Sequence, residues 1–327
     1  MLGSASSLGA SGFGSVDFTF KPIQPWETNQ ATTQPSQRMA LDCDEEHVDA
    51  KPYGIETPID EALCVCCEDL FDDMRTQQTE YVSPSAYNPT ASFLPYRRYL
   101  VDWMSDVGEQ CRLHNSTVHV SILFLDKIFR TRDIPRTRWQ LLATACISVA
   151  AKYEEAEEHC PPIPELLRLT KLGQMGYTPL SFREGELEVL RCLGWKLRAI
   201  PPIHFCGYFL SKGVTFENDS WQGRKLIEKI PKYVKKYSDF FCNLTLQEYA
   251  FQKYLPSHLA AAIILASRVA LQLEPRWKPE LVALTGHAEH ELIEVFHHIW
   301  SYYEEQFPGH GSRAISPRSV SNQDMYA

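Results

Sequence analysis

Two side chains of opposite charge stand at the edges of apolar helix surfaces in this 327-residue sequence. Lys152 follows a stretch from Trp139 to Ala151 that is apolar or small on every side. Glu186 lies within an apolar stripe at helical spacing, four residues before Leu190. Burying a charged group is costly unless a partner hydrogen-bonds it. The two charges therefore predict either an internal ion pair or a site that binds another protein, and the residues alone leave both interpretations open.

Four more carboxylates come shortly after Lys152, namely Glu154, Glu155, Glu157 and Glu158. Negative charge at the C-terminus of a helix opposes the helix macrodipole. Carboxylates at such an unfavourable position indicate either a solvated helix end or a functional site.

No group of residues in the sequence resembles a catalytic centre. The chain has neither a glycine-rich loop of the kind that cradles phosphate nor a nucleophile elbow. Cys64, Cys66 and Cys67 are close together, but no second ligand pair with zinc-site spacing follows, so packing is the better interpretation. We therefore expect no metal, no cofactor and no catalytic activity.

The helices that position these charges are predicted from apolar residues recurring every three or four positions. We expect an all-α fold of two five-helix units, with helices over 93–111, 117–129, 139–155, 164–169, 181–193, 204–210, 226–244, 256–268, 278–284 and 287–306. The segment Leu142–Lys152 resembles Leu259–Arg268, which indicates a weak internal repeat around two Ala-rich central helices. Pro231 should kink or divide its helix.

Composition divides the chain into five parts. Both ends are polar, and the first is rich in Ser, Gly, Thr, Gln and Pro, which predicts disorder. Thr57 and Pro58 have the residue types of an N-cap and a first helical position. The expected parts are a disordered segment (1–55), a helix with a connector (56–91), the two five-helix units (92–200 and 201–307) and a disordered tail (308–327).

Charge and cysteine usage limit the partners and the compartment. The formal net charge of −9 argues against general binding to nucleic acid phosphates. We see no signal peptide and no apolar segment of membrane-spanning length. Several of the ten cysteines lie on faces that we expect to be buried, which suits a reducing compartment. We expect no membrane and no direct nucleic acid contact, and a location in the nucleus, the cytoplasm or both.

The ordered motifs resemble the cyclin family. Five of its hallmark positions are matched, by Arg97, Asp126, Leu141, Lys152 and Glu186. The string Ala151-Lys-Tyr-Glu-Glu155 matches the family's Ser/Ala-Lys-Phe/Tyr-Glu-Glu. The resemblance covers residues 56 to 306 in two cyclin folds, and the second half is most similar to cyclin J, in Tyr237–Phe241, Leu246–Phe251 and Tyr254–Arg268.

The resemblance implies a regulatory subunit of a cyclin-dependent protein kinase, with a role in cell division. Cyclins activate such kinases by packing against the kinase C-helix. The implied kinase-binding residues are Lys152 and Glu186, which would hydrogen-bond kinase backbone groups, and Val149, Tyr153, Leu190 and Leu197, which would form a pocket for an apolar side chain. Arg97 and Asp126 would form a buried structural pair.

The family's substrate-docking patch is altered in this sequence. The family motif Met-Arg-Ala-Ile-Leu is replaced by Tyr96-Arg-Arg-Tyr-Leu100, whereas Trp103 and Gln140 remain at patch positions. Tyr96, Tyr99 and the added Arg98 should change the shape and the charge of the groove. We therefore expect kinase substrates or inhibitors to bind through a patch with altered preference.

A second function is compatible with the same double fold. General transcription factors of the TFIIB type share it, so the alternative is a scaffold that binds transcription machinery or nucleic acid without activating a kinase. The net charge of −9 and the matches at Lys152 and Glu186 favour the kinase subunit.

Overall fold

The computed structural model describes residues 67–82, 84–221, 224–225 and 229–308. All of them belong to one compact unit that starts at residue 50. The expected disordered ends, except Pro308, lie outside the described residues, as do the helix start at Thr57 and the side chains of Cys64, Cys66 and Cys67.

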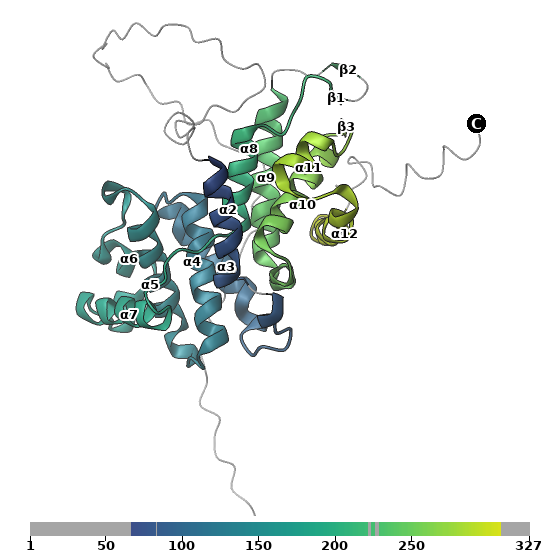
Figure 1. Cartoon of the computed structure of the whole chain (residues 1–327). Coiled ribbons are helices and arrows are strands. Elements are labelled where there is room, and N and C mark those ends of the chain that lie inside the picture. Colours follow the sequence, from purple (N-terminus) through teal and green to yellow (C-terminus); the bar gives the residue numbers. More distant parts are fainter. Residues whose placement is uncertain (1–66, 83, 222–223, 226–228, 309–327) are drawn as a thin grey trace, which may run out of the picture. The chain divides into compact units, whose positions relative to one another are not determined.

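Within the described residues, one leading helix precedes two groups of five. Helix α2 (Cys67–Gln77) is followed by the 3-10 turns η1 (Gln78–Glu80) and η2 (Pro84–Ala86). The first group is α3 (Leu94–Gln110), α4 (Asn115–Thr131), α5 (Trp139–Glu154), α6 (Ile163–Leu169) and α7 (Pro179–Cys192). The second is α8 (Pro202–Lys212), α9 (Ile230–Gln247), α10 (Pro256–Ala270), α11 (Pro279–Thr285) and α12 (Glu289–Gln306). The predicted all-α fold of two five-helix units is confirmed (Figure 1).

Prolines mark the starts of most of these helices. Proline suits the first helical positions because its missing N–H would find no partner inside the helix there, and its fixed φ is already helical. Seven helices have a proline at one of their first two positions, namely α3, α6, α7, α8, α9, α10 and α11.

Each group is built around one helix that is buried on all sides. Every residue of α5 from Leu141 to Ala151 is buried, and α10 is buried continuously from Leu259 to Val269. Alanines and serines in both helices let neighbouring helices approach closely. Helix α5 packs against α4 and α7, whereas α10 packs against α8, α9 and α12. The Ala-rich repeat seen in the sequence therefore corresponds to the two central helices.

Two local predictions for the second group are wrong. Helix α9 begins at Ile230 rather than near residue 226, so Pro231 lies in its first turn and neither kinks nor divides it. Residues 213–223, for which no helix was predicted, contribute a short strand. β1 (Ser220–Trp221) pairs antiparallel with β2 (Arg224–Lys225) and with β3 (Leu273–Glu274). Two-residue strands are too short to show an alternating pattern, so the sequence carried no signal for them.

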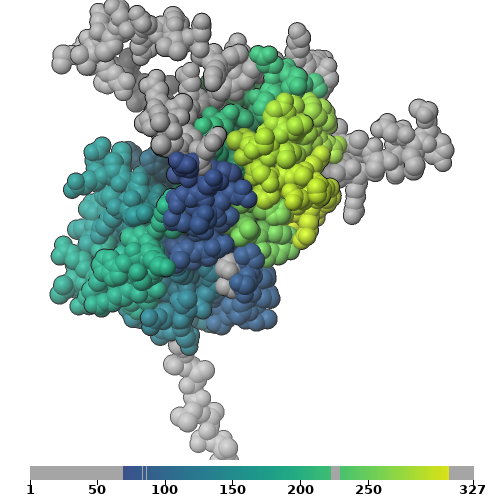
Figure 2. All heavy atoms as spheres, in the orientation of Figure 1, coloured from purple at the N-terminus to yellow at the C-terminus, as the bar shows by residue number. Residues whose placement is uncertain are grey.

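The described residues form two hydrophobic cores that follow the two groups. One contains residues of α3 to α7, and the other contains residues of α8 to α12. Helix α2, in dark blue on the face shown in Figure 2, packs against the second core through Phe71 and Met74. Among the described residues, no helix combines the length and the apolar character needed to cross a bilayer.

Candidate partner-binding site

Lys152 and Glu186 are in direct contact on the surface of the first five-helix group. Lys152 lies in the last turn of α5, and Glu186 lies in α7, which packs against α5. The Nζ atom of Lys152 is 2.6 Å from Oε1 of Glu186. The lysine side chain is 51% exposed, whereas that of Glu186 is 10% exposed. The isolated chain thus contains the internal pair that the sequence had left as one of two interpretations.

Ser148 completes the local arrangement around the glutamate. Its hydroxyl donates to the same Oε1 atom of Glu186 at 2.6 Å. No described residue hydrogen-bonds the second oxygen, Oε2, of this carboxylate. The sequence suggested only a small packing residue at position 148. Ser148 nevertheless lies one turn before Lys152, and residues four positions apart on a helix are neighbours on the same face. The pair therefore keeps one acceptor oxygen and most of an ammonium group available to another molecule.

The apolar residues expected beside this pair differ in their exposure. Val149 is buried in the first core, and Leu190 and Leu197 are half-buried against it. Tyr153 is 48% exposed. Tyr153 and Leu197 line one surface depression of about 520 Å³, together with Gln77, Glu80, Trp195, Lys196 and Arg198.

Trp195 is a residue of this surface that sequence analysis did not single out. Its side chain is 65% exposed, and its φ of 63° is left-handed, as is that of the preceding Gly194. Large residues rarely adopt this conformation, and such outliers tend to occur at functional positions. The only available signal was an aromatic residue directly after a glycine that ends a helix. Tyr153, which follows Lys152 in the chain, and Trp195 thus both expose aromatic surface in this depression.

Glu155 explains why acidic residues follow the end of α5. Its Oε1 atom accepts hydrogen bonds from the backbone N–H of His114 at 2.7 Å and from the hydroxyl of Thr117 at 2.6 Å. Burial acts to raise the pKa of this carboxyl, but the hydrogen bonds from Thr117 and His114 hold the pKa below its usual range. His114 precedes the first residue of α4. The Glu155 carboxylate therefore opposes the macrodipole at the C-terminus of α5 but is stabilised by the macrodipole at the N-terminus of α4.

Arg97 and Asp126 form a buried ion pair between α3 and α4. Two guanidinium nitrogens of Arg97 donate to the two oxygens of Asp126, both at 2.9 Å. The third nitrogen, Nη1, donates to the backbone carbonyls of Leu246 at 3.0 Å and Gln247 at 3.1 Å. Those carbonyls belong to the last turn of α9, so this arginine connects the two five-helix groups.

The residues of the expected docking patch lie along α3 and α5. Tyr96 and Tyr99 are 37% and 64% exposed, and Leu100 and Trp103 are half-buried against the first core. The side-chain amide of Gln140 donates one hydrogen bond to the carbonyl of Thr170 at 2.6 Å, which orients the amide and leaves its oxygen without a partner among the described residues.

An arginine outside the expected patch covers part of it. The guanidinium carbon of Arg136 lies 4.1 Å from the ring centre of Tyr96 and 5.8 Å from that of Trp139. Arg136 has no carboxylate partner among the described residues. A guanidinium group stacked on aromatic rings is held in place at low entropic cost. The patch thus presents an ordered positive charge beside the exposed Tyr96.

No catalytic or metal-binding arrangement emerges among the described residues. No cluster of three or more His, Cys, Asp or Glu side chains there has a geometry that would hold a metal ion. What the arrangement offers is recognition: a lysine, a carboxylate oxygen and aromatic surface at the end of α5.

Comparisons with known proteins agree with this two-unit architecture. A model of the cyclin N-terminal domain matches residues 69–198, and a model of the cyclin C-terminal domain matches residues 201–323. The viral cyclin of herpesvirus saimiri has a similar structure, with a TM-score of 0.55 and 15% identity, covering 74% of this chain and 98% of the viral protein. At this identity the structural likeness supports the fold alone. The fold is that of two tandem cyclin domains, and the chain belongs to the cyclin family.

Sequence relatives carry the same family names. Cyclin-J of Xenopus laevis is 31% identical over 229 residues, which are 69% of this chain and 59% of the relative. Cyclin-D of Ostreococcus tauri is 30% identical over 213 residues, which are 64% of this chain and 56% of the relative. The similarity to cyclin J expected from the sequence is confirmed. The matched part of the chain spans less than two thirds of the length of either relative.

Proposed function

We propose that this protein is a regulatory subunit that binds a cyclin-dependent protein kinase and activates it by holding the kinase C-helix in its active position. The observation that carries the proposal is the Lys152–Glu186 pair, which lies at the protein surface beside exposed aromatic side chains. Membership of the cyclin family supports a kinase as the partner.

The pair has the chemistry needed to recognise the backbone at the ends of a helix. An ammonium group has three donors, and Glu186 occupies one of those of Lys152. Its remaining donors suit backbone carbonyls, and Oε2 of Glu186 suits a backbone N–H. Charge-assisted hydrogen bonds of this kind are stronger than neutral ones. The two side chains are therefore matched to a partner segment that presents both kinds of backbone group.

The surface around the pair would bury an apolar side chain of the kinase. Tyr153 and Trp195 expose aromatic surface, and Leu197 lines the same depression. Leu190 is half-buried against the first core. Burying apolar area contributes roughly 25 cal/mol per Å². The charged pair would set the orientation of the bound helix, and the aromatic surface would supply much of the affinity.

Activation follows from a difference in affinity between two kinase states. A protein kinase requires an ion pair between its β3 lysine and its C-helix glutamate. A subunit that binds the inward C-helix more tightly than the outward one shifts the population toward the active state. In this proposal the cyclin-family chain contributes no catalytic group. It acts in the nucleus or the cytoplasm during cell division.

The altered patch on α3 is part of the same proposal. We assign it the recruitment of kinase substrates or inhibitors, with a preference for peptides that carry acidic residues. The support is the stacked Arg136, which lacks a carboxylate partner within the described part of the chain. Arg98, in contrast, donates to Oε1 of Gln306 in α12.

Co-purification with a panel of cyclin-dependent kinases, followed by a phosphorylation assay, tests the proposal. We expect one or more kinases to bind the wild-type chain and to gain activity on binding. The double variant Lys152→Ala/Glu186→Ala should lose both properties. The matched control is Lys253→Ala/Glu294→Ala, which removes an exposed pair of the second group and should leave both properties intact. If no kinase gains activity while the purified chain binds transcription factors or nucleic acid, the scaffold alternative is correct.

A further inference from the structure

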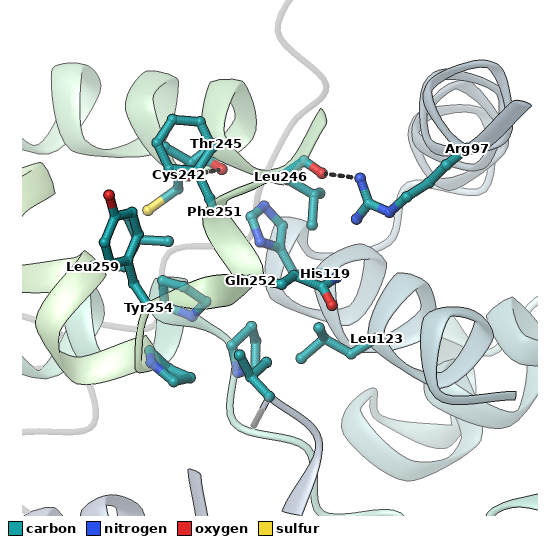
Figure 3. A pocket seen from close by; sticks show the side chains of 14 residues that line it. Arg97, His119, Leu123, Cys242, Thr245, Leu246, Phe251, Gln252, Tyr254 and Leu259 are labelled. Carbon is teal, nitrogen blue, oxygen red and sulfur yellow. Dashed lines mark hydrogen bonds between the residues drawn. The ribbon is translucent and has the colours of Figure 1, made fainter. Parts of the chain in front are cut away.

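A small, partly open cavity lies between the two five-helix groups. Its volume is about 40 Å³, and Figure 3 shows the side chains that line it. His119 of α4 and Leu123 come from the first group, whereas Cys242, Gln252 and Leu259 come from the second. Most of the lining is apolar, so any polar atom that faces the cavity has few protein groups to bond with.

Two buried polar atoms of the cavity lining lack a hydrogen-bond partner among the described residues. They are Nδ1 of His119 and Oε1 of Gln252. His119 is 1% exposed and Gln252 is 9% exposed. In Figure 3 the two labelled side chains lie near each other in the middle of the cavity lining. Native proteins rarely leave such atoms unpaired, because losing hydration without a replacement costs free energy.

The orientation of the Gln252 amide group is fixed by the hydrogen bond that its nitrogen donates to Asp126. Nε2 of Gln252 donates to Oδ2 of Asp126 at 2.5 Å, and a carboxylate oxygen only accepts hydrogen bonds. Exchanging the amide N and O would place two acceptors together. Oε1 of Gln252 is therefore an acceptor that requires a donor.

The second ring nitrogen of His119, Nε2, is hydrogen-bonded to the side chain of Asn243. Nε2 of His119 lies 2.9 Å from Oδ1 of Asn243, an oxygen that also accepts from the amide of Asn115 at 2.9 Å. With Nε2 donating to Asn243, Nδ1 of the neutral ring is an acceptor. The cavity thus contains two acceptors that cannot hydrogen-bond each other.

We propose that the cavity binds one ordered water molecule, which donates one hydrogen bond to Nδ1 of His119 and the other to Oε1 of Gln252. A cavity needs at least about 10–15 Å³ to hold a water, and buried waters bridge polar groups in just this way. Water is the smallest molecule that can donate two hydrogen bonds, which is what the two acceptors require. The ligand is therefore water, and the site belongs to neither the kinase-binding surface nor the docking patch.

The water completes a continuous hydrogen-bonded path between the two cyclin domains. The path runs from Arg97 through Asp126 to Gln252. It continues through the water to His119, and from there to Asn243. Each step from Asp126 onward joins one domain to the other. The water thus makes the polar contact between the domains continuous across an otherwise apolar gap.

A crystal structure of the full 327-residue chain at better than 1.5 Å resolution is the direct test. We expect a well-ordered water within 2.6–3.2 Å of both Nδ1 of His119 and Oε1 of Gln252, a range typical of hydrogen bonds. NMR provides a second measurement in solution. A cross-peak between a long-lived water and the His119 ring should appear, and the ring nitrogen shifts should identify a neutral Nε2–H tautomer.

Two variants make the test specific. Gln252→Met keeps the side-chain length but removes the acceptor, so the water should lose its density and its NMR cross-peak. Leu123→Met changes an apolar lining residue at similar volume, and the water should remain. The proposal is overturned if the wild-type cavity is empty at high resolution, if the ring is the Nδ1–H tautomer bonded directly to Gln252, or if the water persists unchanged in Gln252→Met.

Discussion

Arg97 and Asp126 share two hydrogen bonds of 2.9 Å each, with both side chains almost fully buried. The same guanidinium group also reaches two backbone carbonyls at the end of α9. All three of its nitrogens are thus used, and this arginine contacts both cyclin domains. The family resemblance implied only a buried pair of Arg97 and Asp126. The contact of Arg97 with the end of α9 was not expected.

We expect Arg97→Ala and Asp126→Ala to destabilise the whole unit and not only its first half. Removing one member of a buried pair costs about 3–5 kcal/mol, because the remaining charge stays buried without compensation. Urea unfolding followed by circular dichroism measures the change. Arg98→Ala, next in sequence but exposed, is the control and should change the free energy of unfolding by less than about 0.5 kcal/mol. An Arg97→Ala protein as stable as wild type would contradict the structural role.

We expect Lys152→Ala to weaken kinase binding strongly while hardly affecting the free chain. Losing one partner of a desolvated charged contact costs about 2–5 kcal/mol, or roughly 30- to 4,000-fold in Kd. In the free chain the lysine is half-exposed, so the pair contributes about 0–1 kcal/mol. Calorimetric titration and thermal unfolding separate the two quantities. A large loss of stability with unchanged affinity would show that the pair serves the fold alone.

We expect stability to fall in mild acid because of buried neutral histidines. Burial lowers the pKa of His119 to about 4, as does the nearby His204, while the hydrogen bond to Asn243 acts in the opposite direction. In the unfolded chain the pKa is about 6.5, so between these values the unfolded state binds more protons and stability rises with pH. Lowering the pH from 7.5 to 5 should therefore cost about 2 kcal/mol through this residue.

The check is the difference between wild type and His119→Gln in urea unfolding at both pH values. The variant should show a smaller loss of stability on acidification, by about 2 kcal/mol. His290→Gln is the control, since His290 is exposed. Equal losses in wild type and His119→Gln would mean that the pKa of His119 in the folded state is not lowered.

We expect ordinary Arg-x-Leu peptides to bind this chain weakly. The stacked Arg136 places positive charge beside the patch, although exposure and salt limit the repulsion. Tyr96 and Tyr99 are also bulkier than the residues they replace. Fluorescence titration of an Arg-x-Leu peptide and of an acidic variant compares the two, and the acidic peptide should bind more tightly. Tight binding of the ordinary peptide that Trp103→Ala abolishes would show that the usual groove survives.

The sequence was sufficient for the architecture because the relevant signals are local. The unbroken apolar runs in α5 and α10 predicted two buried central helices, and both are buried. Pro231 was misjudged because the predicted helix began four residues too early, which turned a favourable first-turn proline into an interior one. A helix boundary depends on which backbone groups find partners, and apolar spacing carries little information on that.

The side-chain contacts of the candidate site could not be predicted from the spacing of residues in the sequence. The sequence placed Lys152 and Glu186 on neighbouring apolar surfaces, but it did not decide between an internal pair and a partner site. The contact between them is visible only once α5 packs on α7. Glu155 is similar, because its hydrogen bond to His114 joins residues 41 positions apart. Arg136 gave no periodic signal, since it lies in a 3-10 turn.

The carboxylate of Glu155 also bears on the order in which the chain folds. It closes a loop of 41 residues between α4 and α5, whereas the contact of Arg97 with Leu246 closes one of 149 residues. The entropy of loop closure grows with the logarithm of length, so the longer closure costs about 1 kcal/mol more. We therefore expect the α4–α5 hairpin to assemble early and the docking of the two domains to come late. A nascent chain would complete the end of α5, which carries Lys152, before its second domain is in place.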